Sequence, residues 1–450
     1  MLLTVGVCLC SCKQFIEIDA PKNSVVPATA FKSNDLATAA VLGIYEQMSV
    51  SGYASGGNRS LSVVLGLSAD EFLGYNAENL QLAQNELLTD NAVVLNTWTS
   101  IYARIYNANA ILEGLAHTNG VTPPVKNQLK GEVLFTRAFN YFYLVNLFGS
   151  VPLHLGTDYQ ANGKASRASV DEVYGQIITD LKAAELLSTD NYVTTERVRP
   201  NKATVHALLA RVYLYLQDWP NAGKYAGLII EKNSTYKLTA LDQVFLSNSL
   251  ESIWQLVPPA GSNTPAGALL ILTAAPSGSQ VALRPEFVAN AFETNDQRKT
   301  AWTKSIAAAG TAYYYPFKYK IRASATVTEY HTVFRLAEQF LIRAEARAQQ
   351  NDLSGAIDDL DAIRFRVGLP LIKNTNPGIN KTGLLNAIQK ERRLELFSEW
   401  GHRWFDLKRT QTATATLFPL KPKWKPEYQV FPIPKAETDG NPNISQNDGY

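Results

Sequence analysis

Apolar side chains recur every three or four residues through most of this chain, the spacing that places them on one face of an α-helix. One such stripe runs from Leu134 to Phe148, and Gly149 followed by Pro152 ends the predicted helix. The same spacing predicts helices over residues 36–48, 93–115, 170–187, 204–216, 222–230, 333–348, 353–367 and 384–397. The pattern therefore predicts a mainly α-helical protein.

Two of the predicted helix pairs repeat each other at a constant offset of 134 residues. Small residues at matching positions let the two helices of a pair approach closely, as in tetratricopeptide repeats. Only two clear copies are visible, and they lie far apart in the sequence. We therefore expect a tetratricopeptide-like helical-repeat scaffold with long loop insertions. The matching positions are Ala210, Asp218, Ala222, Ala226 and Ile229 in the first copy and Ala344, Asp352, Ala356, Leu360 and Ile363 in the second.

The segments between the predicted helices differ from them in composition and pattern. Residues 49–58 are rich in Gly and Ser, and residues 258–279 mix Pro, Gly, Ser, Thr and Ala without a clear period, so both are predicted loops. Apolar and basic side chains alternate over residues 316–322, which predicts a strand with one apolar and one basic face. Residues 253–257 and 430–433 are further strand candidates. We expect a few short β-strands to interrupt the helices.

The three cysteines of the chain, Cys8, Cys10 and Cys12, all lie in its first twelve residues. The apolar run before them is too short to span a membrane, but it suits the apolar region of a signal peptide. The residues up to Cys12 have the pattern of a lipobox, which predicts a signal peptide over residues 1–11 and a lipid on the Cys12 sulfur. The basic residues that usually open a signal peptide are missing. Either the true start lies further upstream, which we favour, or the segment is no export signal.

Composition narrows the possible functions. Hydrophobic residues make up 46% of the chain and aromatic residues 10%, which is enough to bury a large core. Past Cys12 no apolar run is long enough to cross a bilayer, so we expect the lipid alone to hold the protein on a membrane. The net charge of +2 argues against nucleic acid as a partner. With one cysteine left after cleavage, five scattered histidines and no nucleotide-binding or nucleophile motif, the sequence predicts no disulfide, metal site or cofactor.

Glu391, Glu395 and Glu399 stand four residues apart on one predicted helix, with arginines between and beside them. Stacked carboxylates repel one another unless cations separate them. A glycosidase uses two carboxylates about 5 to 9.5 Å apart across a cleft, not a single row interleaved with arginines. We therefore expect a structural ion-pair network rather than a catalytic pair. We interpret the acidic run within residues 358–361 as a solvated helix face.

Several blocks of sequence are similar to one known family. Residues 336–346, AIRFRVGLP at 362–370 and ERRLELFSEWGHRWFDL at 391–407 resemble the C-terminal half of the SusD/RagB family. FPIP at 431–434 with residues 441–450 resembles the family's terminal motif. RAFNYF at 137–142 followed by FGSVPL at 148–153 is similar to an early helix and turn of the family, and residues 12–19 resemble its lipoprotein start. The resemblance spans nearly the whole mature chain.

The resemblance implies one SusD-like domain over residues 12–450. Its two halves, at about 12–240 and about 320–450, would consist of helical pairs and flank a loop-rich ligand-binding insertion at about 241–320. The family's role implies a surface-exposed outer-membrane lipoprotein, not an enzyme, that binds oligosaccharide and delivers it to a SusC-like TonB-dependent transporter. Alternatives are a RagB-like lipoprotein that binds peptide, a tetratricopeptide scaffold that binds only proteins and, least favoured, a glycoside hydrolase.

A sugar presents an apolar C–H face edged by hydroxyl groups, so its site needs flat aromatic side chains with polar groups around them. Two segments offer that mixture, and family members place ligand contacts in roughly the same two regions. For the aromatic residues the sequence leaves core packing and ligand contact both open, except that we expect Tyr319 in the core. The first segment contains Trp302, Tyr313, Tyr314 and Tyr315 near Asn295, Asp296 and Arg298, and the second contains Asp70, Glu71, Tyr75 and Asn76.

Overall fold

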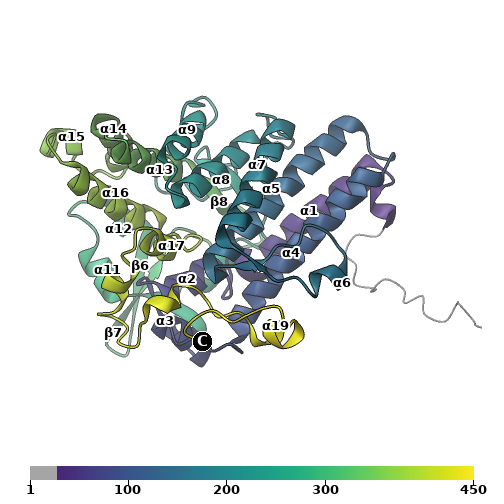
Figure 1. Cartoon of the computed structure of the whole chain (residues 1–450). Coiled ribbons are helices and arrows are strands. Elements are labelled where there is room, and N and C mark those ends of the chain that lie inside the picture. The colour runs from purple at the N-terminus through teal and green to yellow at the C-terminus, as the bar shows by residue number, and fades with distance from the viewer. Residues whose placement is uncertain (1–27) are drawn as a thin grey trace, which may run out of the picture.

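The computed structural model of the protein describes residues 28–450 and is mainly helical with a few short strands (Figure 1). The predicted fold class is thereby confirmed. The predicted signal peptide and Cys12 lie outside the described residues. The helices predicted from periodicity form as α1 (Asn34–Val50), α4 (Ala92–His117), α5 (Pro123–Phe148), α7 (Val170–Leu187), α8 (Lys202–Tyr215), α9 (Trp219–Ile230), α13 (Leu336–Gln349), α14 (Leu353–Arg366) and α16 (Lys381–Leu396).

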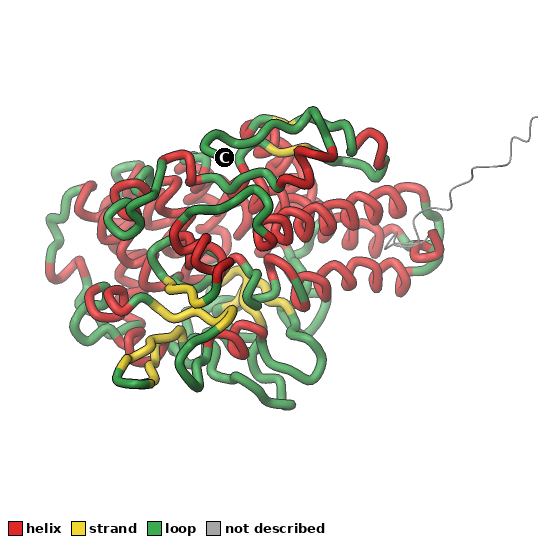
Figure 2. The backbone as a smooth tube through the Cα atoms, turned by 90° about the horizontal axis from the view of Figure 1, so that it is seen from below, coloured by secondary structure: helices red, strands yellow, loops and turns green. Residues whose placement is uncertain are grey.

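These helices pack side by side in one continuous array (Figure 1). α1 packs on α4, and each following helix contacts the next in the order α4, α5, α7, α8 and α9. The array then continues from α9 to α13, and α13 contacts both α14 and α16. Figure 2 shows most of the strands lying together beside the helices, with long loops around them. The array therefore forms the scaffold, and most of the strands lie beside it.

The repeat found in the sequence corresponds to two stacked helix pairs, α8 with α9 and α13 with α14. α8 and α13 match residue for residue at the offset of 134, and α9 and α14 begin at corresponding residues. Asp218 and Asp352 cap α9 and α14 in the same way, because each carboxylate accepts a hydrogen bond from the backbone N–H three residues on, at 3.1 and 3.0 Å. The copies are far apart in sequence but are direct neighbours in space.

Helix α5 is buried over most of its length and joins the two sides of the scaffold. It begins at Pro123. Proline has no backbone N–H, which costs nothing at this position because the first N–H groups of a helix have no partner within the helix. The helix is followed by Gly149, whose φ of 71° is a backbone conformation that glycine adopts without strain. The predicted helix stop is therefore confirmed. The next residues pair as β2 (Val151–Pro152) with β3 (Arg167–Ala168).

A four-stranded antiparallel sheet packs one face against the main core and has the strand order β1, β5, β7, β6. A second sheet pairs β4 (Ser252–Leu256) with β8 (His331–Arg335). The segment predicted as a loop-rich insertion thus contains ordered strands and short helices as well as loops. The strands of the first sheet are β1 (Phe72–Tyr75), β5 (Gly278–Leu283), β6 (Thr303–Ala308) and β7 (Thr311–Pro316). The short helices are η1 (Ala28–Phe31), η2 (Gly52–Ala54), α2 (Leu61–Ser68), α3 (Ala77–Gln84), α6 (Tyr159–Asn162), α10 (Pro265–Leu270), α11 (Pro285–Asn290), α12 (Gln297–Trp302), α15 (Ile372–Thr375), α17 (His402–Arg409), α18 (Ala413–Leu417), η3 (Pro426–Gln429) and α19 (Lys435–Gly440).

Only one of the three predicted strands forms, and it is β4. Residues 430–433 are irregular, because the Phe431 N–H donates to the Leu147 carbonyl of α5 instead of to a sheet. Of residues 316–322 only Pro316 belongs to a strand. The alternation there was misleading because Lys318 lies on no exposed face: it is 4% exposed and pairs with Glu399. The core position predicted for Tyr319 is confirmed.

The acidic run on α14 is not the solvated face that the sequence predicted. Asp358 is exposed, but Asp359 and Asp361 are buried. Arg343 of α13 donates to Asp359 at 2.6 Å, and the backbone N–H of Ile372 donates to Asp361, also at 2.6 Å. The prediction was wrong because a neighbouring helix and the start of α15 cover the side of α14 that the sequence pattern leaves polar.

The main core is rich in aromatic rings. Phe139 of α5 lies 5.5 Å from Trp254 of β4, 5.9 Å from Phe334 of β8 and 5.7 Å from Trp400, measured between ring centroids. These contacts join the central helix to the second sheet and to the C-terminal part of the chain. Between residues 28 and 450, no helix combines the length and the apolar character needed to cross a membrane.

Candidate functional site

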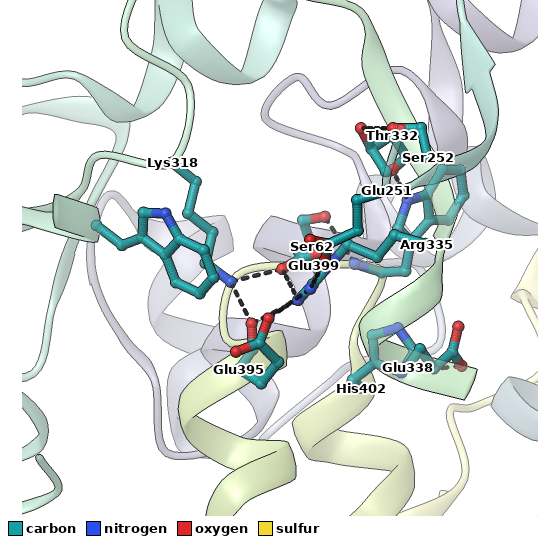
Figure 3. Close-up of polar contacts among 12 residues, drawn as sticks. Ser62, Glu251, Ser252, Lys318, Thr332, Arg335, Glu338, Glu395, Glu399 and His402 are labelled. Carbon is teal, nitrogen blue, oxygen red and sulfur yellow. Dashed lines mark hydrogen bonds and ion pairs between the residues drawn. The ribbon is translucent and has the colours of Figure 1, made fainter. Parts of the chain in front are cut away.

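Glu395, near the end of α16, occupies the centre of a buried ion-pair network (Figure 3). Its carboxylate lies 3.1 Å from Arg298 and 2.5 Å from both Arg335 and Arg366. Burial alone would raise the pKa of Glu395, but the positive charges of Arg366, Arg335 and Arg298 hold it below its ordinary value. The carboxylate is therefore charged and paired inside the protein.

The neighbouring glutamates extend this network, although Glu399 lies just after the end of α16 and not on the same helix as predicted. Glu399 lies 2.8 Å from Arg335 and 2.5 Å from Lys318, and burial lowers the pKa of Lys318 to about 8 (Figure 3). Glu391 pairs with Arg298 at 2.6 Å. Because the glutamates share arginines, protein atoms fill the space where a glycosidase would hold its sugar. The predicted structural network is confirmed.

Three residues predicted to contact a ligand belong to this buried region. The Trp302 ring is fully buried beside Phe245, and its indole N–H donates to the Leu241 carbonyl at 3.0 Å. Arg298 pairs with Asp296 at 2.8 Å, and both side chains are buried. The prediction of ligand contact for Trp302, Asp296 and Arg298 is therefore wrong, because their side chains turn inward to the core and the ion-pair network.

Asp70 and Glu71 lie immediately before β1 and are also buried. Arg403 and Arg393 each donate to Asp70 at 2.7 Å, and although burial opposes them they lower the pKa of Asp70 to about 2. Burial and the charge of Asp70 raise the pKa of Glu71 to about 7. Asp70 also lines a cleft of about 190 Å³ with Arg393 and Arg284. Asp70 thus connects the start of the sheet to α16 and α17 and forms part of a cleft wall.

The structure brings the two predicted segments together at Tyr75 and Tyr313. Tyr75 ends β1 and Tyr313 lies on β7, and their ring centroids are 6.3 Å apart at an interplanar angle of 68°. Both side chains are partly exposed. Ile306 and Phe317 pack into the same cluster. We call Tyr75, Tyr313, Ile306 and Phe317 the sheet-face cluster.

The other predicted residues lie in or near the same sheet. Tyr315 is buried under the sheet-face cluster, whereas Tyr314 packs on the main core, as the alternation of a strand requires. The Asn76 side chain caps α3 by accepting the Asn79 N–H at 2.7 Å. Asn295 is exposed in the turn before α12. Tyr75, Tyr313, Asn76 and Asn295 thus remain open to a ligand.

Two clefts beside β1 were not predicted from the sequence. The larger has a volume of about 420 Å³ and lies between β1 and α3 on one side and residues 420–423 on the other. The smaller is the cleft at Asp70. Arg284, the residue after β5, lines both of them. Nothing in the local sequence marks Arg284, because the walls of these clefts come from segments far apart in the chain.

The arrangement suits binding. The Tyr75 and Tyr313 rings offer flat apolar faces on the four-stranded sheet. The cleft of about 420 Å³ next to β1 falls within the volume range of roughly 300–1,000 Å³ that is usual for small-molecule sites. Across residues 28–450, no three His, Cys, Asp or Glu side chains are grouped so that they could hold a metal ion. A helical-repeat scaffold that presents aromatic side chains and clefts on a sheet beside it defines a class of ligand-binding protein.

Comparison with known proteins identifies the family. A family model described as starch-binding and associating with the outer membrane matches residues 16–214, and the SusD family model matches residues 289–450. SusD-like protein P25 from Formosa agariphila is 24% identical, with 97% of this chain and 95% of that protein covered. A SusD superfamily structure from Bacteroides vulgatus has a TM-score of 0.81 at 22% identity and covers 93% of this chain and 99% of that one. A laminarin-binding SusD-like protein has a TM-score of 0.76 at 25% identity and covers 93% and 100%.

The chain belongs to the SusD/RagB family. The family is one of starch- and glycan-binding proteins associated with the outer membrane. The resemblance seen in the sequence blocks is therefore confirmed over both halves of the chain.

Proposed function

We propose that this protein is a non-catalytic lipoprotein of the outer membrane, held by a lipid on Cys12 and exposed at the cell surface, that binds an oligosaccharide and delivers it to a SusC-like TonB-dependent transporter. Membership of the SusD/RagB family supports the membrane association and the glycan ligand. The similarity to a protein that binds laminarin supports the same class of ligand.

The observation that carries the ligand proposal is the meeting of Tyr75 and Tyr313. These two rings come from strands separated by β5 in the sheet and by more than two hundred residues in the chain. A sugar ring lays its C–H face on such rings, and its hydroxyl groups need polar partners at the rim. Asn76, the residue after Tyr75, supplies one such polar group. We place the oligosaccharide across the sheet-face cluster.

The ion-pair network supports this site indirectly. Arg298 and Trp302 lie on α12, which leads directly into the β6–β7 hairpin that carries Tyr313. Arg298 is fixed by Glu391 and Glu395, and Trp302 is packed in the core. The hairpin is therefore anchored at its base before a ligand arrives, which reduces the entropy lost on binding.

Isothermal titration calorimetry with laminarin oligosaccharides and maltooligosaccharides tests the site. We expect Tyr75→Ala and Tyr313→Ala each to weaken binding about tenfold or more, because each removes a stacking face. Tyr428→Ala is the matched control, since Tyr428 is also partly buried and pairs with another tyrosine, Tyr450, at 5.4 Å. Unchanged affinity in both sheet variants would remove the sheet-face cluster from the proposal.

Further measurements separate the remaining parts of the proposal. Cys12→Ala should abolish labelling by a radioactive fatty acid and release the protein from the membrane fraction. The wild-type protein should copurify with a TonB-dependent transporter and should cleave none of the glycans offered. Binding of a peptide mixture without any glycan would favour a RagB-like role. Copurification without any ligand would favour a scaffold, and glycan cleavage would favour a hydrolase.

A further inference from the structure

A cavity of about 600 Å³ is lined by residues of α4, α6 and α19. Figure 1 shows these three helices well to the right of the β6–β7 hairpin. One wall is α4, the second is the segment of residues 152–163, and the third is α19 with the residues that follow it. The volume falls within the range of roughly 300–1,000 Å³ that is usual for small-molecule sites. None of the residues proposed above for ligand binding lines this cavity.

The α4 wall carries an aromatic stripe. Trp98, Tyr102 and Tyr106 stand four residues apart and therefore on one face of the helix. The Tyr102 ring lies 4.9 Å from the Trp98 ring and 5.1 Å from the His154 ring, between centroids. Tyr106 is 38% exposed, and Tyr159 on the facing helix α6 is 74% exposed. Flat apolar faces thus line both the floor and the rim of the cavity.

The walls are held by buried hydrogen bonds that do not depend on a ligand. The Asn109 amide of α4 donates to the His154 and Gly156 carbonyls at 3.0 and 3.3 Å. Arg137 in turn donates to the Asn109 side chain at 2.9 Å and is held by Asp180 at 2.7 Å. The cavity is therefore preformed, and its amide groups are already used in building it.

Two polar side chains in the cavity keep hydrogen-bonding capacity that the protein does not use up. Glu437 of α19 forms no ion pair within residues 28–450, and the cavity lining contains no lysine or arginine. Burial raises the pKa of Glu437, and the Trp98 indole N–H partly offsets this effect. The buried Nε2 of His154 has no hydrogen-bond partner among the described residues. A buried polar atom without a partner is costly, so a ligand hydroxyl group that bonds to the His154 Nε2 would be favoured.

We propose that this cavity is a second saccharide site, which takes a short neutral segment of a glycan. The sugar rings would lie against Tyr102, Tyr106 and Tyr159, and their hydroxyl groups would donate to Glu437 and bond to His154. A neutral ligand fits because the lining carries a carboxylate and no cation, which disfavours an acidic sugar. The inference rests on the proposed function, that the protein binds glycans, but it concerns a different part of the surface.

Stoichiometry tests the proposal. Calorimetry of the full chain with laminaritriose and maltotriose, both neutral, should reveal two sites for at least one of them. The Tyr106→Ala/Glu437→Gln double variant should lose one site and keep the other, and the loss at the cavity should be about tenfold or more for each change. Both changes are mild for the fold, because Tyr106 is partly exposed and glutamine has the shape of glutamate. Asp439→Asn is the matched control, since it neutralises an exposed carboxylate on the same helix outside the cavity.

The outcomes separate this inference from the proposed function. If the Tyr75→Ala/Tyr313→Ala variant loses all binding and the cavity variant loses none, the second site does not exist. If the cavity variant loses all binding and the sheet variant none, the cavity is the site and the sheet-face cluster is not. Preference of the cavity for an acidic oligosaccharide, such as trigalacturonate, over both neutral trisaccharides would overturn the neutral ligand class.

Discussion

The substitution Glu395→Gln tests whether the buried network is structural. Glutamine keeps the shape of the side chain but removes the charge that Arg298, Arg335 and Arg366 share. Removing one partner of a buried ion pair costs about 3–5 kcal/mol of the free energy of unfolding, because the remaining charges stay buried with less compensation. For a chain of 450 residues the entropy of unfolding is about 1 kcal/mol per kelvin, so the melting temperature should fall by about 3–5 °C.

Calorimetry and guanidinium unfolding measure this change, with Glu427→Gln as the control. Glu427 is exposed, so its neutralisation should alter stability by less than about 0.5 kcal/mol. The folded pKa of Glu395 lies below the unfolded value of about 4.3, so its contribution is present above that pH and is lost as the pH falls. The gap between wild type and Glu395→Gln should therefore shrink on acidification. A gap under about 1 kcal/mol at pH 7, or one independent of pH, would refute the reasoning.

Three further predictions concern stability and are measured by the same unfolding experiments. The pKa of Asp70 is about 2 in the folded protein and about 3.9 when unfolded. Asp70→Asn should therefore lower the free energy of unfolding by about 2.5 kcal/mol at pH 7 and by progressively less between pH 4 and pH 2. An equal loss of stability at pH 2 would show that the charge is unimportant. A Cβ at Gly114 would lie 2.0 Å from the Phe31 ring, so Gly114→Ala should destabilise the protein by about 1–3 kcal/mol. Gly175 has open space around it, so Gly175→Ala should stabilise α7 by roughly 0.5–1 kcal/mol. Similar effects at both sites would contradict the packing. Asp218→Ala and Asp352→Ala should each cost about 1 kcal/mol through loss of a helix cap, and clearly unequal losses would argue against equivalent repeats.

The helical scaffold could be predicted because each long helix shows its buried stripe within its own sequence. The internal repeat predicted a further feature of the fold, because the constant offset and the shared small residues identified two helix pairs as equivalent. That these pairs stack directly, α9 on α13, was not visible. Sequence distance suggested separation, and only the folded chain shows that the segment between them leaves the array and returns.

The sheet region was harder to predict because local pattern does not reveal what covers a side chain. Lys318 and Lys320 alternate with apolar residues as on a half-exposed strand, yet Lys318 is drawn inside by Glu399, which lies 81 residues further along the chain. Trp302 and Tyr313 look alike as candidate ligand platforms. One is buried and the other partly exposed, and the difference depends on Phe245 and the ion-pair network rather than on the neighbouring sequence.

The aromatic stripe of α4 could not be recognised from the sequence as part of a cavity. Trp98, Tyr102 and Tyr106 have the spacing of a core stripe, and within the predicted helix at 93–115 nothing distinguishes them from buried packing. They line a cavity because the facing walls are a short segment after α5 and the C-terminal α19, which reach only part of the helix. No window of sequence contains all three walls.

The direct stacking of α9 on α13 has a consequence for how this protein can change over time. The residues after Ile230 and before Leu336 leave the scaffold and return to adjacent points of it. The free energy of closing such an excursion depends only weakly on its length, by roughly 0.6 kcal/mol for each doubling. Mutation can therefore lengthen or shorten the exposed loops of the excursion while the repeats keep their packing, as long as its core residues, such as Trp254 and Phe334, are retained. These loops can thus change without disturbing the helical frame, and we expect recognition of a new sugar to require changes mainly in them.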